Sequence, residues 1–364
     1  MLEVRNISSL LITIILLGAL VVAHEFGHFI VAKKSGIWVQ EFAVGMGPKI
    51  ASLMKGDTEY SLRALPLGGF CRMEGETEDG SAPGPRSFLT KSVGVRFAVM
   101  FAGPLMNFIL AFIMIFGLTC TSYTATPEIR AVMPASAAEE CGLREGDTIR
   151  KINGKAIHIY DELSYMLMDN RGETIRLEVL SADGKIYQYE LQPRLDEANG
   201  RYLIGFNPNV ETGIFAEPVE GYGKMTVGET MHYSLFSMIN YVKMTAEGLV
   251  RVFTFTAEKD EYGGPIAIFK TVETSYEAGL EYSIAAAVQN VIYIGAVLSA
   301  NLGVLNLFPI PALDGGKILF LAIEAIRRKP LDAELEGKLQ MIGFMFIMGL
   351  MVYVLFSDIM KFII

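Results

Sequence analysis

The distribution of hydrophobic residues along the chain predicts four membrane-spanning helices. Uncharged apolar runs cover residues 6–23, 97–119, 283–313 and 339–357, and the first continues through a short polar motif to about residue 32. A helix needs roughly 20 predominantly apolar residues to cross a bilayer, and each run is near or above that length. The pattern is therefore typical of a polytopic α-helical membrane protein.

The basic residues beside these runs predict the orientation of the chain in the membrane. Ten Lys and Arg residues lie near the span ends in the two loops that follow the first and the third run. They are Lys33, Lys34, Arg86, Lys91, Arg96, Lys317, Arg327, Arg328, Lys329 and Lys338. Four flank the runs on the opposite side: Arg5, Arg130, Lys270 and Lys361. Basic loops stay in the cytoplasm, so we expect both termini and the long 120–282 segment to lie outside it.

The long segment between the second and third runs predicts a soluble domain followed by a linker. Residues 126–210 contain short alternating stretches such as TIRLEVL and KIYQYEL, bounded by Gly-Asp and Asn-Gly turn signals, which are typical of β-strands. The linker, 211–282, contains a helical pattern from 222 to 256 with apolar residues spaced by three and four. This helix either packs on its own domain or lies at the membrane interface, and the pattern fits both.

The composition agrees with a chain that is partly in the bilayer and partly in water. Of the 364 residues, 51% are hydrophobic and 20% are charged, and the mean hydropathy is +0.37. The net charge of −9 argues against nucleic-acid binding, which needs a basic surface. Cys71, Cys120 and Cys141 have no metal-binding spacing, so we expect neither a disulfide framework nor a cysteine metal site.

The polar motif at the end of the first run is His24-Glu25-x-x-His28. Residues four apart share a helix face, so the two imidazoles can hold one metal ion together, with Glu25 beside them. His-Glu-x-x-His on a helix is typical of zinc metalloproteases, in which the Glu accepts a proton from an activated water. The alternative is a hydrogen-bonded His pair without a metal, which would place Glu25 in the membrane with no function to offset its cost.

The end of the third run supplies a candidate third metal ligand, since catalytic zinc commonly has three protein ligands. The other histidines, His158 and His232, lie in the segment expected outside. In NLFPIPALDGGK, Asp314 is the first charge after the uncharged run, and it is either a ligand or part of an Asp-Gly turn. Helix from residue 10 to 23 rises ~21 Å through a hydrocarbon core of roughly 30 Å, which places His24 near the cytoplasmic end of its span. Asp314 is expected at that same end.

Four stretches of the sequence are distinctive when they are taken together: AHEFGHFIVAKKSGIWVQEFAVGMGPKI, LPLGGFCRMEGE, MFAGPLMNF and NLFPIPALDGGK. They resemble the site-2 protease family, and more narrowly its bacterial branch that includes the regulator of sigma-E protease. The resemblance implies a zinc-dependent intramembrane protease, with His24, His28 and Asp314 as the zinc ligands and Glu25 as the catalytic base.

The resemblance also implies roles for two asparagines and a loop. Asn306 is implied to bind substrate or to stabilise the oxyanion in catalysis, and Asn107, in GPLMN, matches a polar position implied to contact substrate. Either asparagine is alternatively a hydrogen-bonding residue between membrane helices. Residues 37–73 resemble the family's membrane-associated β-rich loop, which dips into the bilayer beside the active site, where an unwound substrate can pair with an edge strand.

PASAAEECGLREGDTIRKINGKAI resembles a PDZ domain of the bacterial protease type. The expected organisation is the first two transmembrane helices in 1–125, an inserted extracytoplasmic PDZ domain in 126–210, a linker in 211–282 and the last two transmembrane helices in 283–364. Sigma-E-type relatives have two PDZ domains, whereas this segment holds one. GGPIAIFK, 263–270, also resembles a family segment, but the residues suggest no role for it.

The implied function is cleavage of single-span proteins within or near their transmembrane segments, in the bacterial inner membrane. Substrates would be anti-sigma factors already trimmed by another protease, or signal-peptide remnants. Zinc is the expected cofactor, and the lipid bilayer and membrane-embedded substrates are the expected partners, without nucleic acid. The alternatives are a zinc sensor or transporter, an inactive relative, or a PDZ scaffold. A transporter needs further intramembrane acids or histidines, and the interiors of the second and fourth runs contain none.

Overall fold

The computed structural model describes residues 2–76, 84–168, 170, 172–196, 201–254, 256 and 263–362. The chain forms two compact units. The first, called the membrane unit here, consists of Met1–Met114 and Val242–Ile364, and the second unit is Ile115–Tyr241. We describe each unit by itself.

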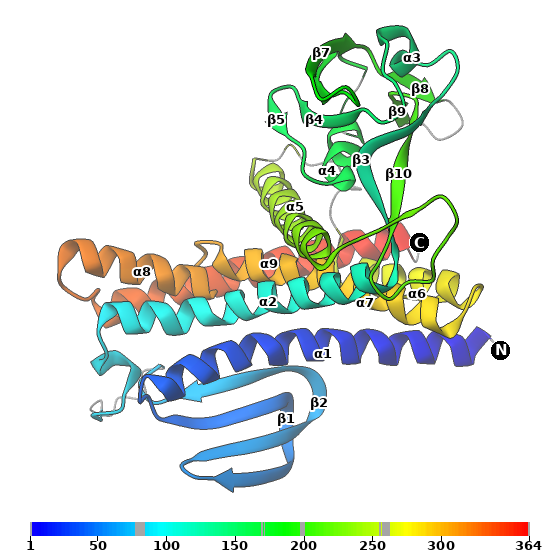
Figure 1. The fold of residues 1–364 in the computed structure, drawn as a ribbon. Coiled ribbons are helices and arrows are strands. Elements are labelled where there is room, and N and C mark those ends of the chain that lie inside the picture. Colours follow the sequence, from blue (N-terminus) through cyan, green and yellow to red (C-terminus); the bar gives the residue numbers. More distant parts are fainter. Residues whose placement is uncertain are drawn as a thin grey trace. The chain divides into compact units, whose positions relative to one another are not determined.

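In the described part of the chain, four helices are long and apolar enough to cross a membrane. They are α1 (Leu2–Lys34), α2 (Val93–Thr121), α7 (Ile284–Leu307) and α9 (Ala333–Phe362) (Figure 1). Shorter elements are η1 (Phe88–Thr90), α6 (Pro265–Leu280) and α8 (Asp314–Arg327). The four predicted spans are confirmed as membrane-length helices, so the chain is a membrane protein. The third helix ends before its apolar run does, because Pro309 and Pro311 cannot continue it.

Small residues allow α1 and α2 to approach each other closely. Gly27 of α1 faces the backbone of α2, and a Cβ at this position would lie 2.2 Å from the carbonyl oxygen of Ala102. A hydrogen bond then joins α2 to α7, because the Ser299 hydroxyl donates to the carbonyl of Asn107 over 2.8 Å. Glycine contacts and interhelical hydrogen bonds of this kind drive association where lipid removes the hydrophobic driving force.

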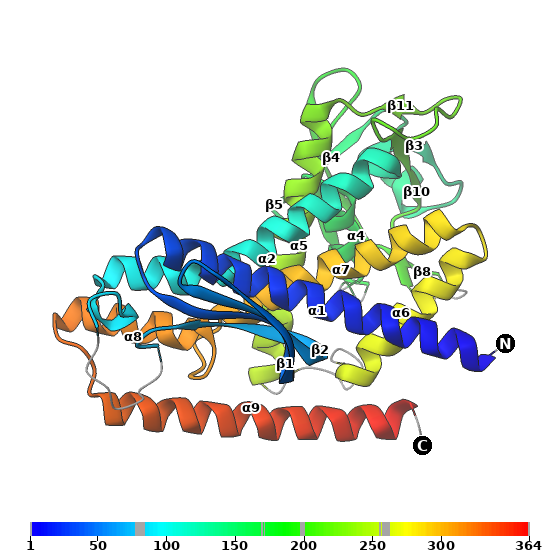
Figure 2. The same ribbon diagram turned by 90° about the horizontal axis from the view of Figure 1, so that it is seen from below.

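Helix α9 lies at the edge of the membrane unit (Figure 2). Most of its apolar side chains are exposed, as a lipid-facing helix requires. Its buried Asp358 accepts hydrogen bonds from the N–H groups of Gly264, Ile266 and Ala267, each over 3.0 Å. The start of α6 has no side-chain cap of its own, so Asp358 supplies one across the two helices. This contact gives the GGPIAIFK stretch, 263–270, a structural role.

The β-rich region predicted for 37–73 is confirmed as an antiparallel pair, β1 (Val39–Lys55) and β2 (Thr58–Met73), beside α1 (Figure 1). The pair folds back on itself, so that residues 41–44 pair with 59–62 on one side and with 69–72 on the other. Gly45 permits the bend: its φ is +88°, and a Cβ would lie 2.6 Å from the Leu65 carbonyl oxygen. The end of β2 thereby becomes an edge.

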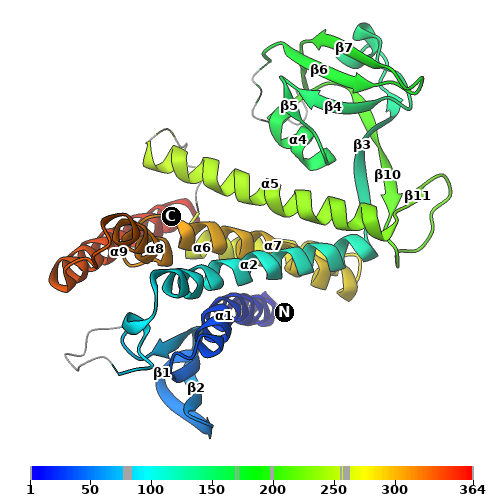
Figure 3. The same ribbon diagram turned by 60° about the vertical axis from the view of Figure 1, so that its left-hand side comes forward.

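The second unit is built around one sheet with the strand order β11-β10-β3-β4-β6-β7, in which β5 also pairs with β4 (Figure 3). Its core contains Ile129, Ile149, Leu163 and Leu177, which are buried almost completely. The elements are β3 (Tyr123–Val132), α3 (Ala137–Cys141), β4 (Thr148–Ile152), β5 (Lys155–Ala156), α4 (Tyr160–Met168), β6 (Ile175–Leu180), β7 (Ile186–Leu191), β8 (Arg194–Asp196), β9 (Arg201–Leu203), β10 (Phe206–Thr212) and β11 (Gly223–Lys224).

The amphipathic helix predicted from 222 to 256 is α5 (Val227–Phe253), which belongs to both units along its length. In the second unit, its Tyr233 hydroxyl donates to Asp161 of α4 over 2.8 Å. In the membrane unit, its Phe253 ring stacks on Phe308, with ring centroids 4.9 Å apart. The first part of α5 therefore packs on its own domain, which is one of the two positions predicted for this helix.

Candidate metal centre

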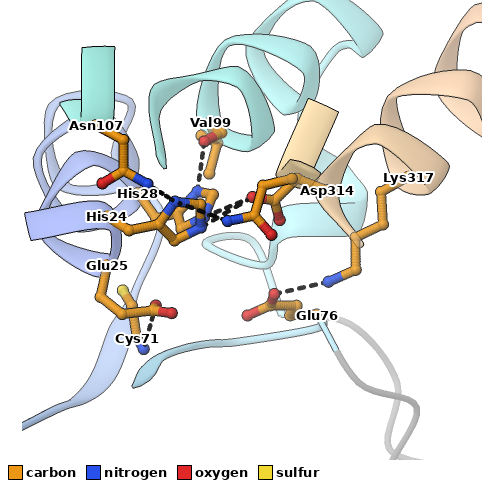
Figure 4. A network of polar contacts seen from close by, with 10 residues as sticks. His24, Glu25, His28, Cys71, Glu76, Val99, Asn107, Asp314 and Lys317 are labelled. Carbon is orange, nitrogen blue, oxygen red and sulfur yellow. Dashed lines mark hydrogen bonds and ion pairs between the residues drawn. The ribbon is translucent and has the colours of Figure 1, made fainter. Parts of the chain in front are cut away.

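Three side chains from two helices of the membrane unit converge on one point (Figure 4). His24 and His28 come from α1, and Asp314 is the first residue of α8. The two Nε2 atoms are 3.1 Å apart, and Asp314 Oδ2 lies 3.0 Å from that of His24 and 3.2 Å from that of His28. Tetrahedral ligands at zinc bond lengths are separated by about 3.3 Å, so this triangle fits one zinc ion with a fourth position open.

The burial and the arrangement of the polar atoms in this cluster suit a bound cation. His24 and His28 are 6% and 5% exposed, and Asp314 Oδ2 is buried with no hydrogen-bond donor among the described residues. Its nearest neighbours are the two Nε2 atoms, which cannot donate to it when they carry lone pairs toward a metal. A bound divalent cation would satisfy the carboxylate and both imidazoles together.

Helix α2 fixes the ring of His28. His28 Nδ1 lies 2.8 Å from the carbonyl oxygen of Val99, so the ring donates there and Nε2 is free to ligate. Pro104 lies inside α2 and provides no N–H, which interrupts the hydrogen bonds of the helix next to this contact. Gly103 makes room for the imidazoles, because a Cβ would lie 2.4 Å from His28 Nε2 and 2.8 Å from His24 Cε1.

Two amide side chains face the other nitrogen of His24. The amide nitrogens of Asn107 and Asn306 lie 3.3 and 3.4 Å from His24 Nδ1. Asn107 is completely buried, and its Oδ1 has no hydrogen-bond partner in the described structure. Asn306 is half-buried, so a molecule entering the site can reach it more easily.

The carboxylate of Glu25 is held by the edge of the β-hairpin. Glu25 Oε2 accepts a hydrogen bond from the backbone N–H of Cys71 in β2 over 3.0 Å (Figure 4). The thiol of Cys71 is not a ligand candidate: burial raises its pKa, and the nearby carboxylates of Glu25 and Glu76 add to the effect. The thiol therefore stays neutral, whereas metal ligation requires the thiolate.

The structure places all the predicted site residues in one neighbourhood: His24, Glu25, His28, Asn107, Asn306 and Asp314. His158 and His232 lie instead in the second unit, where both rings pack on Phe236. Four further residues contribute to the site and were not predicted: Val99, Gly103, Glu76 and Lys317. The glycine before Pro104 and the lysine three residues after Asp314 were the available signals.

The features together define a class of protein. Membrane-length helices hold two histidines and an aspartate at metal-ligand separation, and a glutamate from the same His-Glu-x-x-His segment lies beside them. This combination is that of a membrane metalloprotease.

Comparison with known proteins identifies the family. The model described as Peptidase family M50 matches residues 12–350. A Clostridium acetobutylicum protein is 34% identical over 351 residues, which are 96% of this chain and 97% of the relative. A Clostridium perfringens protein is 37% identical over 343 residues, with 94% and 95% covered. Both are named as candidate zinc metalloproteases.

A further relative, the zinc metalloprotease RasP of Shouchella clausii, is 31% identical over 439 residues, with 97% of this chain and 99% of the relative covered. A solved PDZ domain of an SdrC-like protein from Listeria monocytogenes matches 23% of this chain at 20% identity, and its TM-score of 0.22 does not establish a shared fold. The chain belongs to peptidase family M50, the site-2 protease family, and is a zinc metalloprotease. The predicted family and its zinc cofactor are confirmed.

Proposed function

We propose that the protein is an intramembrane endopeptidase that cleaves single-span membrane proteins within or near their transmembrane segments. The observation that carries the proposal is the donor triangle of His24, His28 and Asp314, two of whose members lie inside a membrane-length helix. Ionisable groups inside a span are costly and are retained for function. A hydrolytic centre at this position reaches peptide bonds that soluble proteases cannot.

In this proposal, His24, His28 and Asp314 hold the zinc, which when bound polarises the scissile carbonyl and acidifies water. Glu25 is the general base: it takes a proton from the attacking water and delivers it to the amine nitrogen of the leaving chain. The hydrogen bond from the Cys71 N–H leaves the other carboxylate oxygen of Glu25 free for this transfer. The Val99 carbonyl keeps the His28 ring in the orientation that ligation needs.

The two asparagines take different roles. A zinc-binding His24 Nε2 requires a proton on Nδ1 and an acceptor for it. A half-turn of the Asn107 amide brings its partnerless Oδ1 to that N–H, which supports a role in orienting His24 in place of the expected substrate contact. Asn306 is the more accessible of the two, and its amide is the one proposed to bind substrate or the oxyanion.

The end of β2 is the proposed platform for the substrate. Residues 69–73 form an edge beside α1, so an unwound substrate can add to it as a strand next to Glu25. The far part of the hairpin exposes apolar side chains, among them Met46, Ile50, Leu53 and Leu65, which suits immersion in lipid.

The remaining assignments follow the topology. We propose a PDZ domain for residues 126–210, outside the cytoplasm together with both termini, and an active site near the cytoplasmic face of the bacterial inner membrane. The basic residues beside the spans support this orientation. Proposed substrates are anti-sigma factors trimmed beforehand outside the membrane, or signal-peptide remnants, whose helix must unwind locally to expose a peptide bond.

The test compares the purified wild type with Glu25→Gln on a single-span model substrate and measures zinc content on the same samples. We expect the wild type to cut within the span, and Glu25→Gln to keep its zinc but lose at least ~10²-fold in rate, as the loss of a general base requires. If both proteins hold zinc and neither cuts several varied substrates, a zinc sensor or a scaffold is the better assignment.

A further inference from the structure

The end of β2 and the turn that follows it contact the two helices of the metal centre, α1 and α8, at one point each (Figure 4). At the first, the Cys71 N–H donates to Glu25. At the second, the Glu76 carboxylate accepts a hydrogen bond from the Lys317 ammonium of α8, with Nζ and Oε1 2.8 Å apart. The segment between the two contacts is fixed by backbone hydrogen bonds, since Glu74 donates to Trp38. A single short segment therefore touches both the candidate base and the helix that provides Asp314.

The first turn of α8 has backbone hydrogen bonds from Gly316 and Lys317 to the Leu313 carbonyl, but it lacks a side-chain cap. Its N-cap residue, Leu313, has no side chain that can accept a hydrogen bond. Asp314 is followed by two glycines that the packing demands, because a Cβ on Gly315 would lie 2.2 Å from the Phe308 carbonyl oxygen and one on Gly316 2.4 Å from that of Ile310. Glycine inside a helix is destabilising relative to alanine. A turn of this kind needs an anchor from outside.

Lys317 is the first residue of α8 after the glycines, and it provides such an anchor. Residues three apart share a helix face, so Lys317 lies on the side of α8 that also carries Asp314. Only a quarter of the Lys317 side chain and 21% of that of Glu76 are exposed, so the pair is shielded from water more than an ordinary surface pair. Burial alone would lower the pKa of Lys317, but Glu76 outweighs it and keeps the ammonium charged.

We propose that Glu76 and Lys317 are positioning residues of the metal centre. The ion pair fixes the first turn of α8 so that Asp314 meets His24 and His28. Together with the Cys71–Glu25 hydrogen bond, the ion pair lets the segment from Cys71 to Glu76 determine the positions of both Asp314 and Glu25. The proposal rests on the proposed zinc site and deepens it.

A second ion pair on α8 provides a matched control. Arg96 of α2 binds Glu324 ten residues after Asp314, and its side chains are 11% and 15% exposed. Both pairs border the same cavity of about 330 Å³. The two pairs thus share a helix and an environment, and they differ in their distance along the helix from the metal ligand.

The experiment measures zinc affinity by competition with a chelator, together with cleavage rates, for Lys317→Met, Glu76→Gln, Lys317→Arg and Arg96→Met. We expect Lys317→Met and Glu76→Gln to weaken zinc binding by ~10–100-fold, the usual effect of losing support for a ligand, and to reduce kcat more than they raise KM. Lys317→Arg keeps the charge and should stay within a few-fold of the wild type. Arg96→Met should lower thermal stability and leave zinc affinity unchanged.

Two results would overturn the proposal. One is wild-type zinc affinity in both Lys317→Met and Glu76→Gln, and the other is an equal loss of affinity in Arg96→Met, which would make the effect one of general folding. The chelator competition measures zinc affinity directly, so it tests the role of the ion pair even if no cleavage is detected. If the wild type binds zinc and cuts nothing, the proposed protease function fails, and the role of the pair is still measured.

Discussion

At the scale of single residues, the geometry of the metal centre depends on glycines beside it as much as on the ligand residues. Gly27 lets α2 approach α1, and Gly103 opens the space that the two imidazoles occupy. Gly315 lets α8 begin directly under the loop that follows α7, so that Asp314 faces α1. Each of these glycines is required by a neighbour closer than a Cβ can approach, and none of them has a side chain that could ligate a metal.

Replacing Gly103 by alanine tests this steric requirement. The new methyl would lie 2.4 Å from His28 Nε2, so one imidazole must move out of the ligand triangle. We expect Gly103→Ala to be purified with far less zinc than the wild type, as measured by atomic absorption. Gly117→Ala is the control, because Gly117 lies in the same helix and no atom of the described residues comes within 4 Å of its Cβ position. Equal zinc in both variants would show that the helices can separate at no cost.

The predictability of a site residue depends on whether its signal is local. His24, Glu25 and His28 could be predicted from spacing alone, because a helix brings i and i+4 together without any tertiary information. Asp314 needed the family resemblance and the topology, since 285 residues separate it from His28 in the sequence. Val99 and Cys71 act through backbone groups, which leave no trace in residue type.

At the scale of elements, the four spans were predictable because lipid demands an apolar length that few other structures need. Helix α8 was not predicted, because it begins Asp-Gly-Gly, which is a turn signal in most contexts. The fold-back of the β-hairpin was not predicted in detail either. Its pairing joins 41–44 to two separate stretches at once, and the sequence alone does not specify which stretches pair.

The contact between α9 and α6 yields a prediction at this scale. Asp358→Ala removes the acceptor of three backbone N–H groups at the start of α6, so that turn should lose about 0.5–2 kcal/mol of local stability. Hydrogen exchange of residues 264–270 should become faster, while zinc content stays at the wild-type level. Asp332→Ala is the control, because the exposed Asp332 caps only the first turn of α9. Unchanged exchange in Asp358→Ala would mean that packing alone holds α6.

At the scale of the whole molecule, the metal centre joins the two chain segments that make up the membrane unit. His24 and His28 belong to the first helix, and Asp314 belongs to a helix that follows the third span. Long-range contacts of this kind are entropically costly to close, and the second unit is inserted between them in the chain. A zinc ion that bridges α1 and α8 is therefore expected to stabilise the membrane unit besides serving catalysis.

Removal of zinc tests this link. A ligand that binds only the folded state stabilises it by about 4 kcal/mol when its free concentration is 1,000 times Kd, so a chelator should lower the thermal unfolding midpoint of the detergent-solubilised protein. His24→Ala should unfold at the lower midpoint with or without added zinc, because one arm of the bridge is missing. Glu25→Gln should keep the zinc-dependent shift, because Glu25 is proposed as a base and not as a ligand. A chelator that leaves the wild-type midpoint unchanged would mean that protein contacts hold α1 and α8 together without the metal.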